Sequence, residues 1–303
     1  MKQTLMDLVQ RTIVLKCNLP SEERKLQQSH LSNKSDNCFA ITDLVNLSKI
    51  IYNNIINYAY DAFEMRYNDD VLLKRALYSR IRYNDEASDK AKLGYGFYGE
   101  VLLHAVLNVI YKVPPLISKG HFFILGNGES KGYDSYHLIE SGEYIHLWFG
   151  EAKFREQSAS CINSALDNLD SKVLTNKYFT DNNFIPIFDE MQKSDSYEAK
   201  LKSSRLLDIK NKWIEKGEIN IEDFKTEKIG IVYPVLIAFN ESSKGYDGSI
   251  TNCVDYIKNN YAKLVFDKLS IDRTIFFIFI PMKDVKTVKN TVIQWIESKE
   301  QLM

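Results

Sequence analysis

Apolar residues recur three or four positions apart in several stretches of the chain, and this spacing predicts amphipathic helices. Thr42 or Asp43 can cap the first of them with a side-chain oxygen, and Pro114 ends another because proline cannot continue a helix. The pattern predicts helices at residues 44–58, 70–82, 98–110, 157–177, 251–267 and 283–298, and a polar helical insertion near residues 190–217.

Shorter apolar runs bounded by turn residues predict the strands. They lie at residues 121–125, 133–139, 144–154, 229–239 and 274–280. The run at 275–280 is apolar at every position, which predicts a strand covered on both faces. Pro234 lies inside the run at 229–239 and predicts an edge strand or a bulge, because proline has no N–H to donate. The polar residues 20–38 lack any period and predict a loop.

The order of these elements predicts the fold class. From residue 98 it reads helix, three strands, helix, strand, helix, strand, helix. This order is typical of an α/β fold, in which helices sandwich a mixed β-sheet. We expect a mostly helical N-terminal region at residues 1–90, followed by one domain at residues 91–303 that carries the helical insertion.

The charge balance indicates no strong overall attraction to nucleic acid. Lys and Arg number 39 against 40 Asp and Glu, which gives a net charge of −1, so any basic surface must be local. Residues 74–82 and 200–212 are locally basic; the first stretch could contact phosphates or be an ordinary solvated helix face. The four cysteines form no Cys-x-x-Cys pair, which argues against a zinc site or a disulfide framework.

No stretch approaches the roughly 20 apolar residues of a membrane span. The first residues also lack the apolar region of a signal peptide. We therefore expect a cytoplasmic protein that neither enters a membrane nor needs a small-molecule cofactor.

The strongest chemical signal is the pair Glu151 and Lys153 at the end of an apolar strand. Other Glu-x-Lys triplets begin at residues 23, 129, 198 and 297, but they lie in polar surroundings. Residues two apart in a strand point to the same face, so Glu151 and Lys153 should project side by side. If the strands at 133–139 and 144–154 form a hairpin, Asp134 lies close to Glu151.

Two carboxylates beside a lysine are suited to phosphodiester hydrolysis. Asp134 and Glu151 supply the hard oxygen ligands that Mg²⁺ or Mn²⁺ prefers. Lys153 could orient the attacking water or stabilise developing charge, and Glu100 could bind the metal through a water or complete a second site. Each residue also has an ordinary interpretation: Glu100 as a favourable acid in the first turn of a helix, Asp134 as a turn residue, and Glu151 with Lys153 as a salt bridge.

These residues, in this order of elements, resemble the PD-(D/E)xK nuclease core, although no proline precedes Asp134. More narrowly, three segments look like those of the HamA family, the nuclease subunits of the Hachiman anti-phage defence system. They are Gly94-Tyr-Gly-Phe-Tyr-Gly-Glu100, Lys131-Gly-Tyr-Asp134 and Trp148-Phe-Gly-Glu-Ala-Lys-Phe154. The resemblance implies DNA cleavage and a helicase partner, a HamB-like subunit that restrains the nuclease until it is triggered. The insertion near 190–217 and the N-terminal helices are the candidate docking surfaces.

Other polar and aromatic residues near these motifs leave two interpretations open. His137 and His146 lie on the same strands and could reach the site or be structural. The aromatic residues before Glu100 could either stack on nucleotides or pack in the core. They are Tyr95, Phe97 and Tyr98. Gln157 could face the cleft. Asp247 ends a second copy of the Lys-Gly-Tyr-Asp tetrapeptide. The simpler interpretation is a turn residue that lies before a helix or at its beginning.

Two alternative functions remain open at this stage. One is a catalytically silent module with a nuclease fold that regulates a partner helicase. The other is an RNase that uses the same site, because such a site contacts the phosphodiester and not the sugar.

Overall fold

The computed structural model describes residues 1–19, 36–60, 68–116, 118, 133–173, 205–216, 221–261, 271 and 273–303. Their centre is a six-stranded sheet with the strand order β1-β2-β6-β5-β4-β3. The strands are β1 (Ile13–Leu19), β2 (Asp36–Ile41), β3 (Ser135–Ser141), β4 (Tyr144–Phe154), β5 (Ile229–Asn240) and β6 (Arg273–Met282).

The sheet is mixed, as the sequence predicts. The four central strands β4, β5, β6 and β2 are parallel to one another, whereas the edge strands β3 and β1 pair antiparallel with β4 and β2. The central strand β6 is buried along nearly its whole length, because helices cover both of its faces. Hairpin pairing of β3 with β4 sets Ser135 opposite Gly150, which fixes the register next to the candidate chemical residues.

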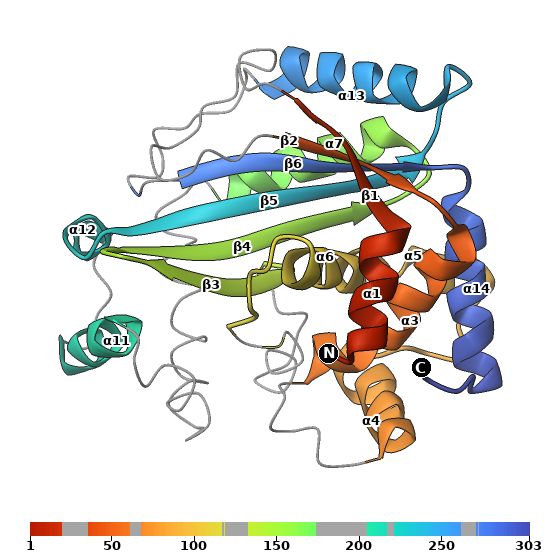
Figure 1. Ribbon diagram of the computed structural model, residues 1–303, viewed down its shortest axis with the longest axis horizontal. Helices are drawn as coiled ribbons and strands as arrows, with labels where there is room; N and C mark the ends of the chain where they lie inside the picture. Colours follow the sequence, from red (N-terminus) through yellow and green to blue (C-terminus); the bar gives the residue numbers. More distant parts are fainter. Residues whose placement is uncertain are drawn as a thin grey trace.

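Helices cover both faces of the sheet and make three layers (Figure 1). One face carries α1 (Gln3–Thr12), α3 (Leu44–Ala59), α6 (Phe97–Val109) and α14 (Val285–Ser298). The other carries α7 (Ser158–Asn168) and α13 (Gly245–Tyr261). Shorter elements are α4 (Asp69–Arg75), the π-helix Ala76–Ile81, α5 (Asp89–Gly94), the π-helical turn Leu169–Val173, α11 (Arg205–Lys216) and α12 (Ile221–Thr226).

Side chains of β4 divide between the two faces with the period of two that a strand imposes. Trp148, Ala152 and Phe154 join the apolar cluster under α3, α6 and α14. Leu147 and Phe149 join the cluster under α7 and α13. Glu151 and Lys153 follow Phe149 in this alternation and therefore point toward α7.

The edge position or bulge expected from Pro234 is wrong. Strand β5 is paired on both sides, with β4 and with β6, and its register with β4 is the same before and after the proline. The pairing with β4 is interrupted only between Val232 and Val235, so the missing N–H of Pro234 needs no shift. A Cβ added at the facing Gly150 would lie 2.5 Å from Ser135 Oγ and 2.6 Å from a Leu103 methyl, but in ordinary contact with the Pro234 ring at 3.4 Å. The glycine is therefore required by Ser135 and Leu103 and not by the ring.

Most of the predicted elements are present in the described residues, with shifted ends. Helix α13 begins at Gly245, six residues before the predicted start, and the predicted helix at 70–82 becomes π-helical from Ala76. The first two strands were not predicted: β1 begins directly after α1, and β2 begins at Asp36 inside the expected loop.

Some predicted segments cannot be compared with the structure. The strand at 121–125, the residues 190–204 of the insertion and the residues 262–267 of a helix lie outside the described residues. The division of the chain at residue 90 stays a prediction, although β1 and β2 join the same sheet as the later strands. Among the described helices, none is long and apolar enough to cross a membrane.

Candidate active site

Asp134 is held at the end of the β3–β4 hairpin by two hydrogen bonds to the backbone of β4. Its N–H donates to the Gly150 carbonyl at 2.8 Å, and its Oδ2 accepts from the Ala152 N–H at 2.8 Å. The carboxylate thus takes the place of a strand carbonyl and continues the ladder by one step. Since Ser135 is paired with Gly150, Asp134 lies opposite Glu151.

Glu151 is almost fully buried and is bonded by three side chains. Its Oε1 contacts the Lys153 ammonium and accepts from Asn168 Nδ2 at 2.7 Å, while its Oε2 accepts from the Tyr233 hydroxyl at 3.3 Å. Asn168 ends α7 and Tyr233 lies on the neighbouring strand β5. The carboxylate is therefore fixed by the sheet and by the helix above it.

The surroundings of Glu151 shift its pKa upward. Burial raises the pKa of Glu151, and the negative charge of Asp134 raises it further, while Lys153 and Asn168 oppose the shift. Burial and the Glu151 charge also raise the pKa of the Tyr233 hydroxyl. Two carboxylates close enough to repel each other in a buried place have a natural partner in a cation.

Glu100 approaches the same region from the opposite layer. It lies in the first turn of α6, and its Oε2 accepts from the Tyr58 hydroxyl of α3. Helix α6 comes this close to the sheet because residue 99 is glycine: a Cβ there would lie 3.3 Å from the Ala152 Cβ and 3.2 Å from the Phe154 Cβ.

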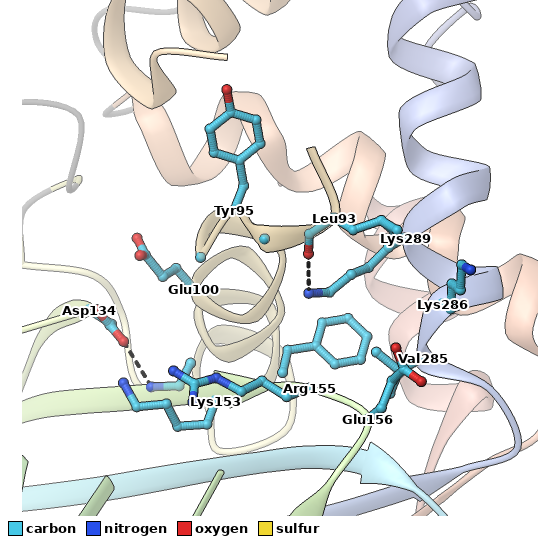
Figure 2. A pocket seen from close by; sticks show the side chains of 14 residues that line it. Leu93, Tyr95, Glu100, Asp134, Lys153, Arg155, Glu156, Val285, Lys286 and Lys289 are labelled. Carbon is cyan, nitrogen blue, oxygen red and sulfur yellow. Dashed lines mark hydrogen bonds between the residues drawn. The ribbon is translucent and has the colours of Figure 1, made fainter. Parts of the chain in front are cut away.

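A pocket of about 360 Å³ lies where these elements meet. Asp134, Glu100 and Lys153 line it together, whereas Glu151, which contacts the Lys153 ammonium, does not line it. Figure 2 shows these three at one side of the pocket and the lysines of α14 at the other. The complete lining consists of Leu93, Gly94, Tyr95, Gly96, Glu100, Asp134, Ala152, Lys153, Phe154, Arg155, Glu156, Val285, Lys286 and Lys289.

The described residues contain no group of three or more His, Cys, Asp or Glu side chains arranged to hold a metal ion. The candidate ligands are thus the pair Asp134 and Glu151, with Glu100 of α6 at the same side of the pocket as Asp134 (Figure 2). Mg²⁺ commonly uses only one or two carboxylates and fills its shell with water and phosphate oxygens. A two-carboxylate site whose members repel each other suits such an ion.

The two histidines have surroundings typical of structural residues. His137 is buried, its Nδ1 lies 2.8 Å from the Val113 carbonyl, and burial lowers its pKa to about 4. His146 is half-buried, and burial lowers its pKa. Neither histidine lines the pocket.

The remaining sequence candidates lie in different places. Phe97 and Tyr98 are core residues, whereas Tyr95 lines the pocket. Gln157 is exposed just before α7, outside the pocket lining, and Asp247 is exposed in the first turn of α13.

Several neighbours of the site were missed from the sequence. Asn168 and Tyr233 are far from Glu151 along the chain and carry no motif. Arg155 lies two residues after the Glu-x-Lys triplet, and this position could have indicated it. Lys289 looks like an ordinary polar residue of an amphipathic helix, and no local signal separates it from its exposed neighbours.

Comparison with known protein families gives a match over nearly the whole chain. A family model described as HamA matches residues 10–296. No curated protein and no solved structure matches.

Proposed function

Because the chain belongs to the HamA family, we propose that it is a metal-dependent nuclease that hydrolyses DNA, the effector subunit of a Hachiman-type anti-phage complex with a helicase. The observation that carries the proposal is the position of Asp134 opposite the Glu151–Lys153 pair, at a pocket shared with Glu100. This is the set that the PD-(D/E)xK resemblance implies, collected from three separate elements.

Asp134 and Glu151 are the proposed ligands of Mg²⁺ or Mn²⁺. Burial, and after it the charge of Asp134, raises the pKa of Glu151, and a cation between the two carboxylates would relieve their mutual repulsion. When bound, such an ion polarises the scissile phosphate and makes a water easier to ionise. The two backbone hydrogen bonds of Asp134 and the Asn168 and Tyr233 bonds of Glu151 hold both carboxylates in place without a substrate.

Lys153 and Glu100 have supporting roles in this proposal. The Lys153 ammonium lies between Glu151 and the pocket, where it stabilises negative charge that develops on the phosphate. Tyr58 holds the Glu100 carboxylate at the same end of the pocket (Figure 2), where Glu100 orients a water, either a free one or one bound to the metal.

One observation favours a second candidate, a catalytically silent module that regulates a helicase. Both oxygens of Glu151 are bonded to side chains of the chain itself, which is also what a purely structural ion pair would show. DNA cleavage distinguishes the two candidates. Only a nuclease loses this activity when one carboxylate of the site is replaced by an amide.

The proposed helicase partner supplies most of the DNA engagement and restrains cleavage. A net charge of −1 is unfavourable for holding a polyanion, whose binding usually depends on a basic surface. The proposed docking surfaces are the N-terminal helices and the insertion, of which α11 is described. Tight DNA binding by the lone chain, or no association with the helicase, would contradict this part of the proposal.

The test is cleavage by the complex with the neighbouring helicase. Plasmid, single-stranded DNA and RNA are incubated with Mg²⁺, and Asp134→Asn is compared with wild type. The chain offers a matched control in Asp247→Asn, since Asp247 ends the same Lys-Gly-Tyr-Asp tetrapeptide but is exposed on α13. We expect Asp134→Asn to lower the DNA cleavage rate about 100-fold or more and Asp247→Asn to leave it unchanged. Cleavage of RNA alone would support the RNase, and equal activity of all three proteins would exclude Asp134 from catalysis.

A further inference from the structure

Lys289 is a lysine in an unusual position on the terminal helix α14. It is only 7% exposed, yet it lines the pocket that Asp134, Glu100 and Lys153 share. Its ammonium donates to the Leu93 carbonyl at 2.8 Å and lies 5.1 Å from the centre of the Tyr98 ring and 5.4 Å from that of Phe154.

These neighbours are neutral, so they compensate only part of the cost of burying a positive charge. Burial accordingly lowers the pKa of Lys289 to about 8. A methionine of similar length would pack against the two rings without this cost. The ammonium is therefore expensive at this position unless an anion enters the pocket beside it.

Two more cations lie around Lys289 and belong to the same pocket. Arg155 follows β4, and Lys286 is exposed in the first turn of α14. The Arg155 guanidinium bonds to serine oxygens of α7. Among the described residues, no carboxylate forms an ion pair with Lys289, Arg155 or Lys286, and Glu156 is the acid that lines this side of the pocket.

The pocket thus has two ends with different chemistry. Asp134, Glu100 and Lys153 lie at one end, and Lys286 and Lys289 lie at the other, with Arg155 between them in Figure 2. A nucleic-acid strand that runs along the pocket with its scissile phosphate at the first end brings a neighbouring phosphate toward the second. Lysine and arginine are the side chains that bind such phosphates.

We propose that Lys289, with Arg155 and Lys286, forms a second phosphate subsite that holds a backbone phosphate next to the scissile one. This inference rests on the proposed nuclease function and deepens it. Lys289 is a positioning residue: it fixes the strand along the pocket, so that the scissile phosphate meets Asp134 and Lys153 in the correct register.

Binding without cleavage tests the subsite. A fluorescent single-stranded DNA of about six nucleotides, on the order of the 4–16 nucleotides of a single-strand site, is titrated with the full-length chain at low salt without divalent metal. We expect Lys289→Met to weaken binding about tenfold, the loss of one charge-assisted hydrogen bond, and to lower the salt slope by about one. The control is Lys258→Met, an exposed lysine of α13 on the other face of the sheet, which should bind like wild type.

Probes with and without a 5′-phosphate distinguish a backbone phosphate from a terminal one, and inorganic phosphate tests for a free one. Equal affinity for probes with and without a 5′-phosphate supports a backbone phosphate. Binding of the phosphorylated probe alone, or of inorganic phosphate with the same Lys289 dependence, overturns that assignment in favour of a terminal or free phosphate. Unchanged binding by Lys289→Met, or no binding by wild type at low salt, overturns the subsite itself.

A second measurement needs no variant and therefore does not depend on the folding of Lys289→Met. Lysines of the wild-type chain are acetylated in trace amounts with and without the probe, and each site is quantified by mass spectrometry. Protection of Lys289 but not of Lys258 supports the subsite, and equal labelling of Lys289 in both samples overturns it. Because no metal is present, a failed cleavage assay with intact Lys289-dependent binding would refute only the nuclease function.

Discussion

The buried pair of Glu151 and Lys153 makes a quantitative prediction about stability and catalysis together. Their side chains are 7% and 14% exposed. Removing one partner of a buried pair leaves an uncompensated charge and costs about 3–5 kcal/mol, whereas removing both is often close to neutral. We therefore expect Glu151→Gln and Lys153→Met to be strongly non-additive in the free energy of unfolding.

The two single variants should differ in a definite direction. Glu151→Gln leaves the Lys153 ammonium without its carboxylate, and we expect a loss of about 3 kcal/mol. Lys153→Met removes the cation that lowers the pKa of Glu151, which burial and Asp134 already raise. The carboxyl can then take up a proton, so the loss should be smaller. The double variant should fall at least about 2 kcal/mol short of the sum of the singles.

Urea unfolding followed by tryptophan fluorescence measures these free energies by linear extrapolation. The matched control is the exposed pair Glu222 and Lys225, whose side chains are 67% and 52% exposed. The same substitutions there should couple by no more than about 0.5 kcal/mol.

Cleavage by the helicase complex is measured on the same proteins. All three variants of the buried pair should lose about 100-fold or more in rate, including the double variant whose stability is restored. Additive losses of stability within about 0.5 kcal/mol would refute the buried ion pair. Cleavage retained by Glu151→Gln in Mg²⁺ would refute the active site.

Three further outcomes are expected. Gly150→Ala should destabilise the chain by about 1–3 kcal/mol in urea unfolding, because its Cβ would lie 2.5 Å from Ser135 Oγ and 2.6 Å from a Leu103 methyl. The control Gly94→Ala, whose Cβ would have nothing within 4 Å, should change stability little. Equal losses of stability in the two variants would contradict this packing. Mg²⁺ should raise the melting temperature of wild type but not of Asp134→Asn, since a cation bound only by the folded state stabilises it; identical shifts in both proteins would place the ion elsewhere. Burial lowers the pKa of Lys289 from 10.5 to about 8, so the unfolded state binds more protons between these values, and stability should rise by about 3 kcal/mol from pH 8 to 10.5 relative to Lys289→Met. The difference between these two proteins removes the contributions of Arg155, Glu156 and Cys161, and a flat difference would contradict the burial of a charged lysine.

The chemical residues were accessible from the sequence because their signals are local. Glu151 and Lys153 are two apart at the end of an apolar strand, and strand geometry alone sets them on one face. Asp134 belongs to the hairpin partner of that strand, so a short turn fixes its distance from Glu151. The family resemblance rests on the same short segments.

Local pattern also indicated the mixed sheet between helices, since apolar runs such as 275–280 require cover on both faces. Local pattern did not indicate β1 or β2. Strand β1 lies at the edge of the sheet, and most of its positions are exposed. The outer strand β1 owes its conformation to pairing with β2, and β2 extends the sheet by pairing with β6. The β2–β6 pairing joins residues far apart in the chain, such as Cys38 and Phe279, and no window of sequence contains both.

Pro234 shows the same division between local and tertiary causes. Proline at this position correctly indicated a lost hydrogen bond, but its consequence depended on the two neighbouring strands. Pairing with β4 resumes in the same register at Val235, and pairing with β6 continues through Pro234, so the strand stays inside the sheet.

The sequence by itself determined the α/β class, the hairpin and the triplet at its end, because these follow from periods of two and 3.6 residues and from short turns. Only the tertiary structure decided what surrounds them. Packing of α6 on the sheet brings Glu100 to the pocket, the end of α7 brings Asn168 to Glu151, and α14 brings Lys289 to the pocket from the far end of the chain. The burial that distinguishes Lys289 from an exposed lysine exists only once that helix has docked against the sheet.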